Sequence, residues 1–427
     1  MSDFPDGFLW GSATSAHQVE GGNTNSDWWE WEHTPGSAAV ESSGDGIDHW
    51  HRYDEDFALL AALGQNAHRF SLEWSRIEPA EGEFSRAALD HYARVLESLA
   101  HHGLTAFATL YHFTLPRWFA ARGGWLADDA LDVFGRYVEK IAQRVGDLIP
   151  YACTVNEPQI VALQGYWRGH FPPGRQNIEE AQHVNSILAQ AHRTATAALR
   201  SGHGRPKIGT CLQLPCIEPL RSDCADDIAT ADMIRTGMVD FHIDDLRRGG
   251  DVGDFVGLQY YTRFQIDATV PGFIAAPAAE AETTQTGWEV YPDGLGRMLR
   301  RIAEAGLPII VTENGIATAD DSQRIRFLAA HLRRVKQAMD AGVDVRGYIY
   351  WSSFDNFEWA HGYGPTFGLI AIDRDNHYRR VVRPSAVAYG TVARSGSLTS
   401  YWSWPETPRR TDGFSNPSNL SHAGNYK

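Results

Sequence analysis

Residues 105–155 read TAFATLYHFTLPRWFAARGGWLADDALDVFGRYVEKIAQRVGDLIPYACTV, and this stretch decides the fold. It begins and ends with short apolar runs, residues 105–111 and 151–155, which are typical of strands buried on both faces. Between them, residues 130–145 carry apolar side chains three and four positions apart, the periodicity of an amphipathic helix. Strand, crossover helix and strand together form the βαβ unit of a parallel sheet. The stretch therefore predicts an α/β protein.

The same unit recurs along the chain. Further strands are expected at residues 8–14, 67–72, 207–212, 255–260, 308–312 and 346–351, and further helices at residues 53–63, 87–101, 178–201, 295–304 and 323–340. Gly64, Gly103, Gly202 and Gly342 each follow a predicted helix, where glycine readily adopts the left-handed conformation that ends a helix. Eight strands in this alternation predict a single (β/α)8 TIM barrel, with its active site at the carboxyl ends of the strands.

We expect the barrel to occupy residues 1–394 and residues 395–427 to form a C-terminal extension. The extension is rich in Ser, Pro, Asn and Gly. It also carries Tyr401, Trp402 and Trp404, which could dock it on the barrel.

Charge and cysteine content exclude several classes of protein. The formal net charge is −15, from 53 acidic and 38 basic residues, which disfavours binding to nucleic acid or to an anionic membrane. No stretch has the ~20 apolar residues of a membrane helix, and a secretory signal pattern is not evident. The four cysteines, at positions 153, 211, 216 and 224, lack metal-site spacing. Buried reduced thiols and a cytoplasmic location are therefore expected.

Residues that can bind or react with a polar ligand gather where the predicted strands end. They are His112, Asn156, Glu157, Gln259, Tyr261, Glu313 and Trp351. Glu157 lies in Thr-Val-Asn-Glu-Pro, where Pro158 stops the strand, and Glu313 lies in Val-Thr-Glu-Asn-Gly, where Gly315 allows a sharp turn. Each carboxylate alone could be a salt-bridged residue at the rim. Two carboxylates at one barrel mouth favour glycoside hydrolysis, in which one protonates the leaving oxygen and the other attacks the anomeric carbon.

The order of these motifs resembles glycoside hydrolase family 1, the family of retaining β-glucosidases and β-galactosidases. The resemblance runs from about Phe4 to about Tyr389 and begins with Phe-Leu-Trp-Gly-Ser-Ala-Thr-Ser-Ala-His-Gln-Val-Glu-Gly-Gly at residues 8–22. It implies that Glu157 is the general acid/base and Glu313 the nucleophile. It also implies double displacement through a covalent glycosyl-enzyme, without a metal or cofactor.

The resemblance implies a role for each remaining strand-end residue. Gln18 and His112 would bind the glycone, Asn156 would hold its 2-hydroxyl, and Tyr261 would hydrogen-bond the nucleophile. Arg76, in Ser-Leu-Glu-Trp-Ser-Arg, would lie beside Glu313 and keep it ionised. His112 as a structural histidine, and Arg76 as the partner of another buried acid, are the alternatives.

The segment from Trp351 to Asp373 implies the rest of the sugar site. Trp351 would form its apolar floor and be followed by a cis peptide, although a core aromatic is the alternative. Glu358 would bind the 4- and 6-hydroxyls, with Trp359 alongside. Because a carboxylate at position 358 repels phosphate, an unphosphorylated glycone is expected.

Three departures from the family pattern affect the region around the site. Gln259 stands where the family usually has Asn, and Thr366 where Arg is frequent. Residues 214–254 form a shorter stretch than usual, which predicts a wider aglycone side. The aromatic run at residues 27–32 either lines the aglycone entrance or, as is commoner, packs a loop.

We therefore expect hydrolysis of terminal, non-reducing β-D-glycosides, glucosides first and galactosides or fucosides next. The ligand would be a small glycoside or oligosaccharide, and a homo-oligomer is left open. Transglycosylation at the same site and a catalytically silent sugar-binding barrel are the alternatives.

Overall fold

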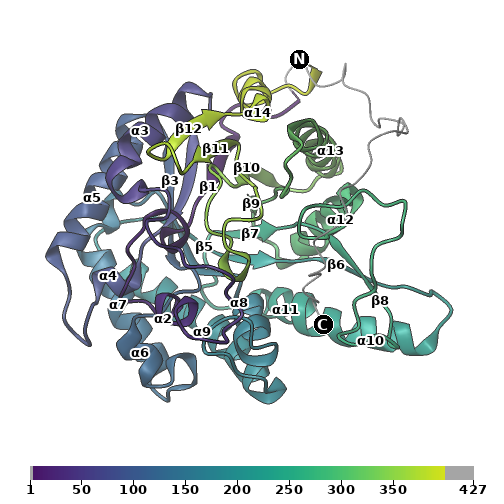
Figure 1. Cartoon of the computed structure of the whole chain (residues 1–427), viewed down its shortest axis with the longest axis horizontal. Helices are drawn as coiled ribbons and strands as arrows, with labels where there is room; N and C mark the ends of the chain where they lie inside the picture. Colours follow the sequence, from purple (N-terminus) through teal and green to yellow (C-terminus); the bar gives the residue numbers. More distant parts are fainter. Residues whose placement is uncertain (1–2, 400–427) are drawn as a thin grey trace.

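The computed structural model describes residues 3–399, and its centre is a closed barrel of eight parallel strands (Figure 1). Around the barrel the strands follow the order β1-β10-β9-β7-β5-β4-β3-β2. They are β1 (Leu9–Ala13), β2 (Ala67–Ser71), β3 (Thr105–Tyr111), β4 (Tyr151–Asn156), β5 (Lys207–Gln213), β7 (Phe255–Gln259), β9 (Ile309–Glu313) and β10 (Val345–Trp351). Each coincides with a predicted strand, so the predicted TIM barrel is confirmed.

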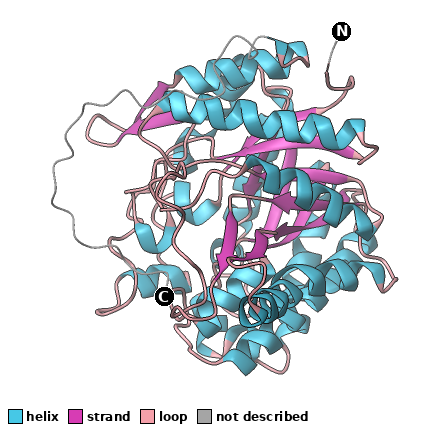
Figure 2. Cartoon of the chain, turned by 90° about the vertical axis from the view of Figure 1, so that its right-hand side faces the viewer, coloured by secondary structure: helices cyan, strands magenta, loops and turns pink. Residues whose placement is uncertain are grey.

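Helices surround the barrel, as the cyan ribbons outside the magenta strands show (Figure 2). The six predicted helices correspond to α3 (His49–Ala62), α5 (Arg86–His101), α7 (Ala130–Arg144), α9 (Ile178–Ser201), α12 (Pro292–Ile302) and α13 (Asp321–Asp340). Three helices of seven or more residues were not predicted: α10 (Ala225–Arg235), α11 (Phe241–Arg247) and α14 (Pro384–Ser395).

Shorter elements build the loops at the barrel ends. The short α-helices are α1 (Ala16–Val19), α2 (Asp27–Glu32), α4 (Trp74–Ile77), α6 (Arg117–Ala121) and α8 (Pro158–Ile160). Single turns of other helix types are η1 (Gly124–Leu126), η2 (Gly146–Leu148), η3 (Val161–Trp167), η4 (Thr236–Asp240), η5 (Ala303–Ala305) and η6 (Trp359–His361). Two small sheets pair β6 (Cys216–Pro219) with β8 (Arg263–Ile266) and β11 (Ile370–Asp373) with β12 (Arg379–Val382).

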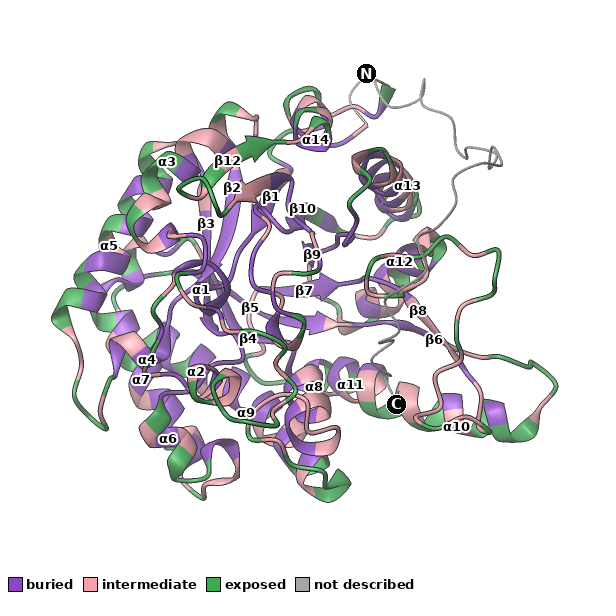
Figure 3. Cartoon of the chain, in the orientation of Figure 1, coloured by how far each residue is buried: buried purple, intermediate pink, exposed green. Residues whose placement is uncertain are grey.

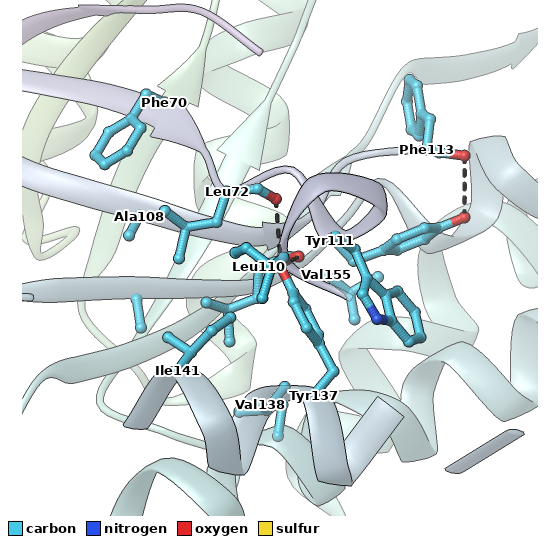
Figure 4. Close-up of a cluster of buried hydrophobic side chains, with 14 of the residues drawn as sticks. Phe70, Leu72, Ala108, Leu110, Tyr111, Phe113, Tyr137, Val138, Ile141 and Val155 are labelled. Carbon is cyan, nitrogen blue, oxygen red and sulfur yellow. Dashed lines mark hydrogen bonds between the residues drawn. The ribbon is translucent and has the colours of Figure 1, made fainter. Parts of the chain in front are cut away.

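The buried core has an inner and an outer layer, which appear purple in Figure 3. The outer layer lies between strands and helices, where Tyr137, Val138 and Ile141 of α7 pack against the barrel (Figure 4). The Tyr137 hydroxyl donates to the Leu110 carbonyl at 3.0 Å, so its polar end is satisfied inside this layer. Side chains inside the barrel, among them Phe107, form the inner layer. The strands are buried on both faces, which is why their sequences are mostly apolar.

Three of the four predicted glycine caps are left-handed: φ is 97° at Gly64, 72° at Gly103 and 90° at Gly342. The prediction is wrong for Gly202, where φ is −75° and the backbone is extended. A Cβ at Gly202 would lie 2.8 Å from the Cβ of Ala142 in α7. Glycine is required there because two elements approach closely, and not because a helix ends.

The barrel closes where the first strand meets the last. Leu9 to Ala13 of β1 pair with residues 347–351 of β10. The hydroxyl of Tyr389, on α14, lies 2.8 Å from the Gly11 carbonyl of β1 and 2.9 Å from the Tyr348 carbonyl of β10. The last described helix therefore fastens both sides of this closure.

The predicted C-terminal extension falls mostly on residues 400–427, which lie outside the described residues, so its docking remains a prediction. Between residues 3 and 399, none of the helices combines the length and apolar character needed to cross a membrane. All four cysteines are free, and three of them are buried while Cys224 is partly exposed.

Candidate active site

The two predicted catalytic carboxylates lie at the carboxyl ends of two barrel strands. Glu157 directly follows β4, and Glu313 is the last residue of β9. Both are enclosed, since only 7% of Glu157 and 4% of Glu313 is exposed. The fold thus brings together two acidic groups that are 156 positions apart in the sequence.

The backbone around both carboxylates is unusual. Glu157 has a φ of 47°, a left-handed conformation that is uncommon for a residue with a side chain, and its N–H donates to the Cys211 carbonyl at 2.8 Å. Such conformations cluster at functional sites. Gly315 does not have a positive φ, so a left-handed conformation is not what requires glycine there. A Cβ there would lie 1.7 Å from the Trp351 carbonyl oxygen, and glycine is needed for this close approach. The predicted cis peptide between Trp351 and Ser352 is present.

Two donors bind the carboxylate of Glu313. The guanidinium of Arg69 donates to Oε1, and the Tyr261 hydroxyl donates to Oε2 at 2.5 Å, as the resemblance implied for Tyr261. Burial raises the pKa of Glu313 above its usual value, and the Arg69 charge and the hydrogen bonds from Tyr261 and Arg69 oppose part of this rise. These contacts stabilise the ionised form in a buried place.

Glu157 lies in a different environment. Burial raises its pKa well above the usual range, and the negative charge of Glu313 raises it further, with the Arg69 charge opposing. Since the direct donors are on Glu313, Glu157 is the carboxyl that holds its proton more strongly. The pair therefore holds one neutral acid and one carboxylate.

The predicted partner of Glu313, Arg76, is wrong. Arg76 binds the carboxylate of Glu20 at 2.9 Å and the Gly21 carbonyl, and its guanidinium lies over the Trp50 ring. Arg69, in the middle of β2, lies beside Glu313, where Arg76 was expected. The signal was an arginine inside a buried strand, where a charge persists only beside a partner.

The other predicted sugar-binding residues surround the carboxylates. Gln18 donates to the Phe357 carbonyl at 2.7 Å and lies 3.5 Å from a carboxylate oxygen of Glu358. Burial and the charge of Glu313 raise the pKa of Glu358 to about 8. The His112 ring is nearly parallel to those of Trp351 and Trp359, at centroid distances of 6.0 and 5.9 Å.

An amide network joins the two halves of the site. Asn156 Oδ1 accepts from Arg69 at 2.5 Å and from Gln259 Nε2 at 2.9 Å. Its Nδ2 lies 3.3 Å from His112 Nε2. Burial and the charge of Arg69 lower the pKa of His112 well below its usual range, so the ring is neutral. All predicted site residues thus lie at this end of the barrel, but Arg76 binds Glu20 there and does not contact Glu313.

The structure also places the remaining residues noted in the sequence. Trp28, in the aromatic run, packs against Trp359 and Phe171 at ring distances of 4.7 and 4.8 Å, which agrees with the packing interpretation. Phe171 was not singled out from the sequence, because a lone aromatic in a loop carries no distinguishing signal. Thr366 is held in its loop by the Arg324 guanidinium, which binds its carbonyl at 2.7 Å. Among residues 3–399, no group of three or more His, Cys, Asp or Glu has the arrangement of a metal site.

The chain is similar to known glycosidases over nearly its whole length. The family model for glycosyl hydrolase family 1 matches residues 1–261 and 252–397. β-Glucosidase A of Thermotoga maritima is 32% identical, covering 93% of this chain and 99% of the relative. A β-glycosidase structure from Pyrococcus horikoshii has a TM-score of 0.88 at 36% identity, covering 95% of this chain and 99% of that one. A structure of Thermotoga maritima β-glucosidase in complex with glucoimidazole has a TM-score of 0.87 at 30% identity, covering 92% and 99%.

Proposed function

The chain belongs to glycosyl hydrolase family 1 and is a retaining β-glycosidase, and we propose that Glu313 is its nucleophile and Glu157 its general acid/base. In the first step Glu313 attacks the anomeric carbon while Glu157 protonates the leaving oxygen, which forms a covalent glycosyl-enzyme. In the second step Glu157, now ionised, takes a proton from water. The water attacks the anomeric carbon and releases Glu313.

The observation that carries this assignment is the difference between the environments of the two carboxyls. Glu313 accepts hydrogen bonds from Arg69 and Tyr261, whereas burial and the charge of Glu313 keep Glu157 protonated. Pairs of carboxyls whose surroundings push their pKa values apart divide into an acid and a nucleophile in this way. The reverse assignment would require attack by the carboxyl that holds its proton more strongly.

The proposed substrates are terminal, non-reducing β-D-glucosides, followed by galactosides and fucosides, with an unphosphorylated glycone. Relatives named as β-glucosidases and a relative's complex with glucoimidazole support the glucoside. The carboxyl of Glu358, 3.5 Å from Gln18 Nε2, supports an unphosphorylated glycone, because the ionised form of this group would repel a phosphate. The four free cysteines support a cytoplasmic location.

The test is the intact mass of the protein after incubation with 2-deoxy-2-fluoro β-glucosyl fluoride, followed by peptide mapping. We expect one glycosyl adduct on Glu313 and none on the Glu313→Gln variant. In parallel, the wild-type chain should release nitrophenol from 4-nitrophenyl β-glucoside. An adduct on Glu157 would refute the assignment of roles. No adduct and no turnover on a panel of aryl glycosides would favour a silent sugar-binding barrel.

A further inference from the structure

Gln259, the last residue of β7, makes an unbalanced set of hydrogen bonds. The residue is completely buried, and its Nε2 donates to Asn156 Oδ1 at 2.9 Å. Its Oε1 is also buried and has no hydrogen-bond partner among the described residues. A buried acceptor without a partner destabilises a protein. The Gln259 side chain thus combines a favourable hydrogen bond to Asn156 with an unfavourable contribution to stability from its unpaired oxygen.

The donors on Asn156 fix the orientation of its amide. Oδ1 accepts from Gln259 Nε2 and from Arg69 Nη2, which occupies both lone pairs of an amide oxygen. Rotating the amide by 180° would bring its NH2 group against two other donors. The Asn156 amide can therefore adopt only one of its two orientations.

In that orientation the Asn156 NH2 group faces His112, which the family resemblance assigns to glycone binding. Nδ2 lies 3.3 Å from Nε2 of the neutral His112, which acts as the acceptor. An amide nitrogen has two N–H groups, so one remains for a ligand. Arg69 also donates to Glu313, and Glu157 follows Asn156 in the chain. The Asn156 side chain, which carries the free N–H, is thus linked to Glu313 through Arg69 and is adjacent to Glu157 in the chain.

We propose that Gln259 is a positioning residue, which holds the Asn156 amide with one N–H directed at the 2-hydroxyl of the bound glycone. The proposal rests on the proposed function, in which Asn156 binds that hydroxyl. Contacts to the 2-hydroxyl of a glycoside strengthen in the transition state. Loss of Gln259 therefore lowers kcat more than it raises KM, and it acts only on substrates that carry a 2-hydroxyl.

The experiment compares two substrates, 4-nitrophenyl β-glucoside and its 2-deoxy analogue, in wild type and Gln259→Met. Methionine keeps the length of the side chain and removes both the donor and the unpaired acceptor. We expect kcat/KM to fall about 10-fold on the glucoside, mainly through kcat, and less than about 2-fold on the 2-deoxy substrate. Equal losses on both substrates, or no loss on either, would overturn the proposal.

Gln159 offers a matched control. It is buried, its Oε1 also lacks a partner among the described residues, and its Nε2 donates to the Gln213 carbonyl instead of to Asn156. Gln159→Met should leave the ratio of the two kcat/KM values unchanged. A change in that ratio as large as in Gln259→Met would show that any lost buried amide has this effect, and would refute the specific role.

Two further variants keep the test decisive if Gln259→Met folds poorly. Gln259→Asn is shorter by one methylene, so its donor falls short of Asn156 and the same selective loss is expected. In an Asn156→Ala background, adding Gln259→Asn should cause no further loss on the glucoside; an additional loss above about 3-fold would overturn the proposal. Wild type without turnover or adduct would reject the proposed function itself. An active wild type whose substrate ratio does not change in the variants would reject only the role of Gln259.

Discussion

Replacing Arg69 with methionine should remove the only direct cationic partner that the structure gives to Glu313 among residues 3–399. Arg69 is fully buried and donates to both Glu313 and Asn156. Without it, the Glu313 carboxylate keeps one donor, the Tyr261 hydroxyl. Since the Arg69 charge lowers the pKa of Glu313, that pKa should rise in the variant.

The expected loss of activity in Arg69→Met follows from the burial of the ion pair between Arg69 and Glu313. Removing one partner of a buried ion pair is unfavourable by about 3–5 kcal/mol. If this appears in the transition state, kcat/KM on 4-nitrophenyl β-glucoside should fall about 100- to 10,000-fold. Arg69→Lys keeps the charge but loses the two-pronged geometry, so its activity should lie between wild type and Arg69→Met.

The assay is the pH dependence of kcat/KM, whose acidic limb reports ionisation of the nucleophile in the free enzyme. The limb should move to higher pH in Arg69→Met, because more base is then needed to ionise Glu313. Arg76→Met is the control, since Arg76 binds Glu20 and does not contact Glu313. Thermal unfolding of each variant separates loss of activity from loss of folding.

Two results would refute this reasoning. One is an acidic limb that stays in place when Arg69 is replaced in a folded protein. The other is a larger shift of the limb in Arg76→Met than in Arg69→Met, which would return to Arg76 the role that the sequence resemblance implied.

Three further outcomes are expected. Tyr261→Phe should lower kcat/KM about 10- to 100-fold and shift the acidic limb upward, because Glu313 loses a charge-assisted hydrogen bond; an unshifted limb would contradict this. Glu358 holds its proton up to about pH 8 in the folded chain but only to about 4.5 unfolded, so it destabilises the fold as pH rises between these values. The free energy of unfolding, measured with urea, should therefore be higher in Glu358→Gln than in wild type, and this difference should be about 2–4 kcal/mol larger at pH 8 than at pH 5. A difference that does not change with pH would argue against an acid that holds its proton in the folded chain. Tyr389→Phe should lower the free energy of unfolding by about 1–2 kcal/mol with kcat unchanged, whereas a fall in kcat at full stability would link Tyr389 to the site.

The barrel was predictable because parallel strands buried on both faces leave continuous apolar runs in the sequence. The helices that escaped prediction have weaker signals. α10 has only two buried residues, Asp227 and Ala231, so little apolar periodicity marks it. α11 has seven residues, about two turns, which is too short for a periodic pattern to stand out.

The site was predictable where a residue type and its position at a strand end agreed, as at Glu157 and Glu313. It was missed where the choice lay between two nearby arginines, although the position of Arg69 inside a predicted buried strand was a signal for it. Arg69 and Arg76 are seven positions apart, and only the paired register of β2 with β1 and β3 places Arg69 inside the barrel. Gly315 shows the same limit, since its neighbour, Trp351, is 36 positions later in the chain, at the end of the adjacent strand β10.

The closure of β1 on β10 has a consequence for how the protein is made. Ala13, the end of β1, and Val345, the start of β10, are 332 positions apart. At a synthesis rate of about 5–20 residues per second, β1 leaves the ribosome roughly 20–60 seconds before its second partner exists. During that interval the outer edge of β1 offers unpaired N–H and C=O groups to any other extended chain. Expression yield should therefore depend on chaperones that cover the N-terminal strand until translation has delivered β10 and Tyr389.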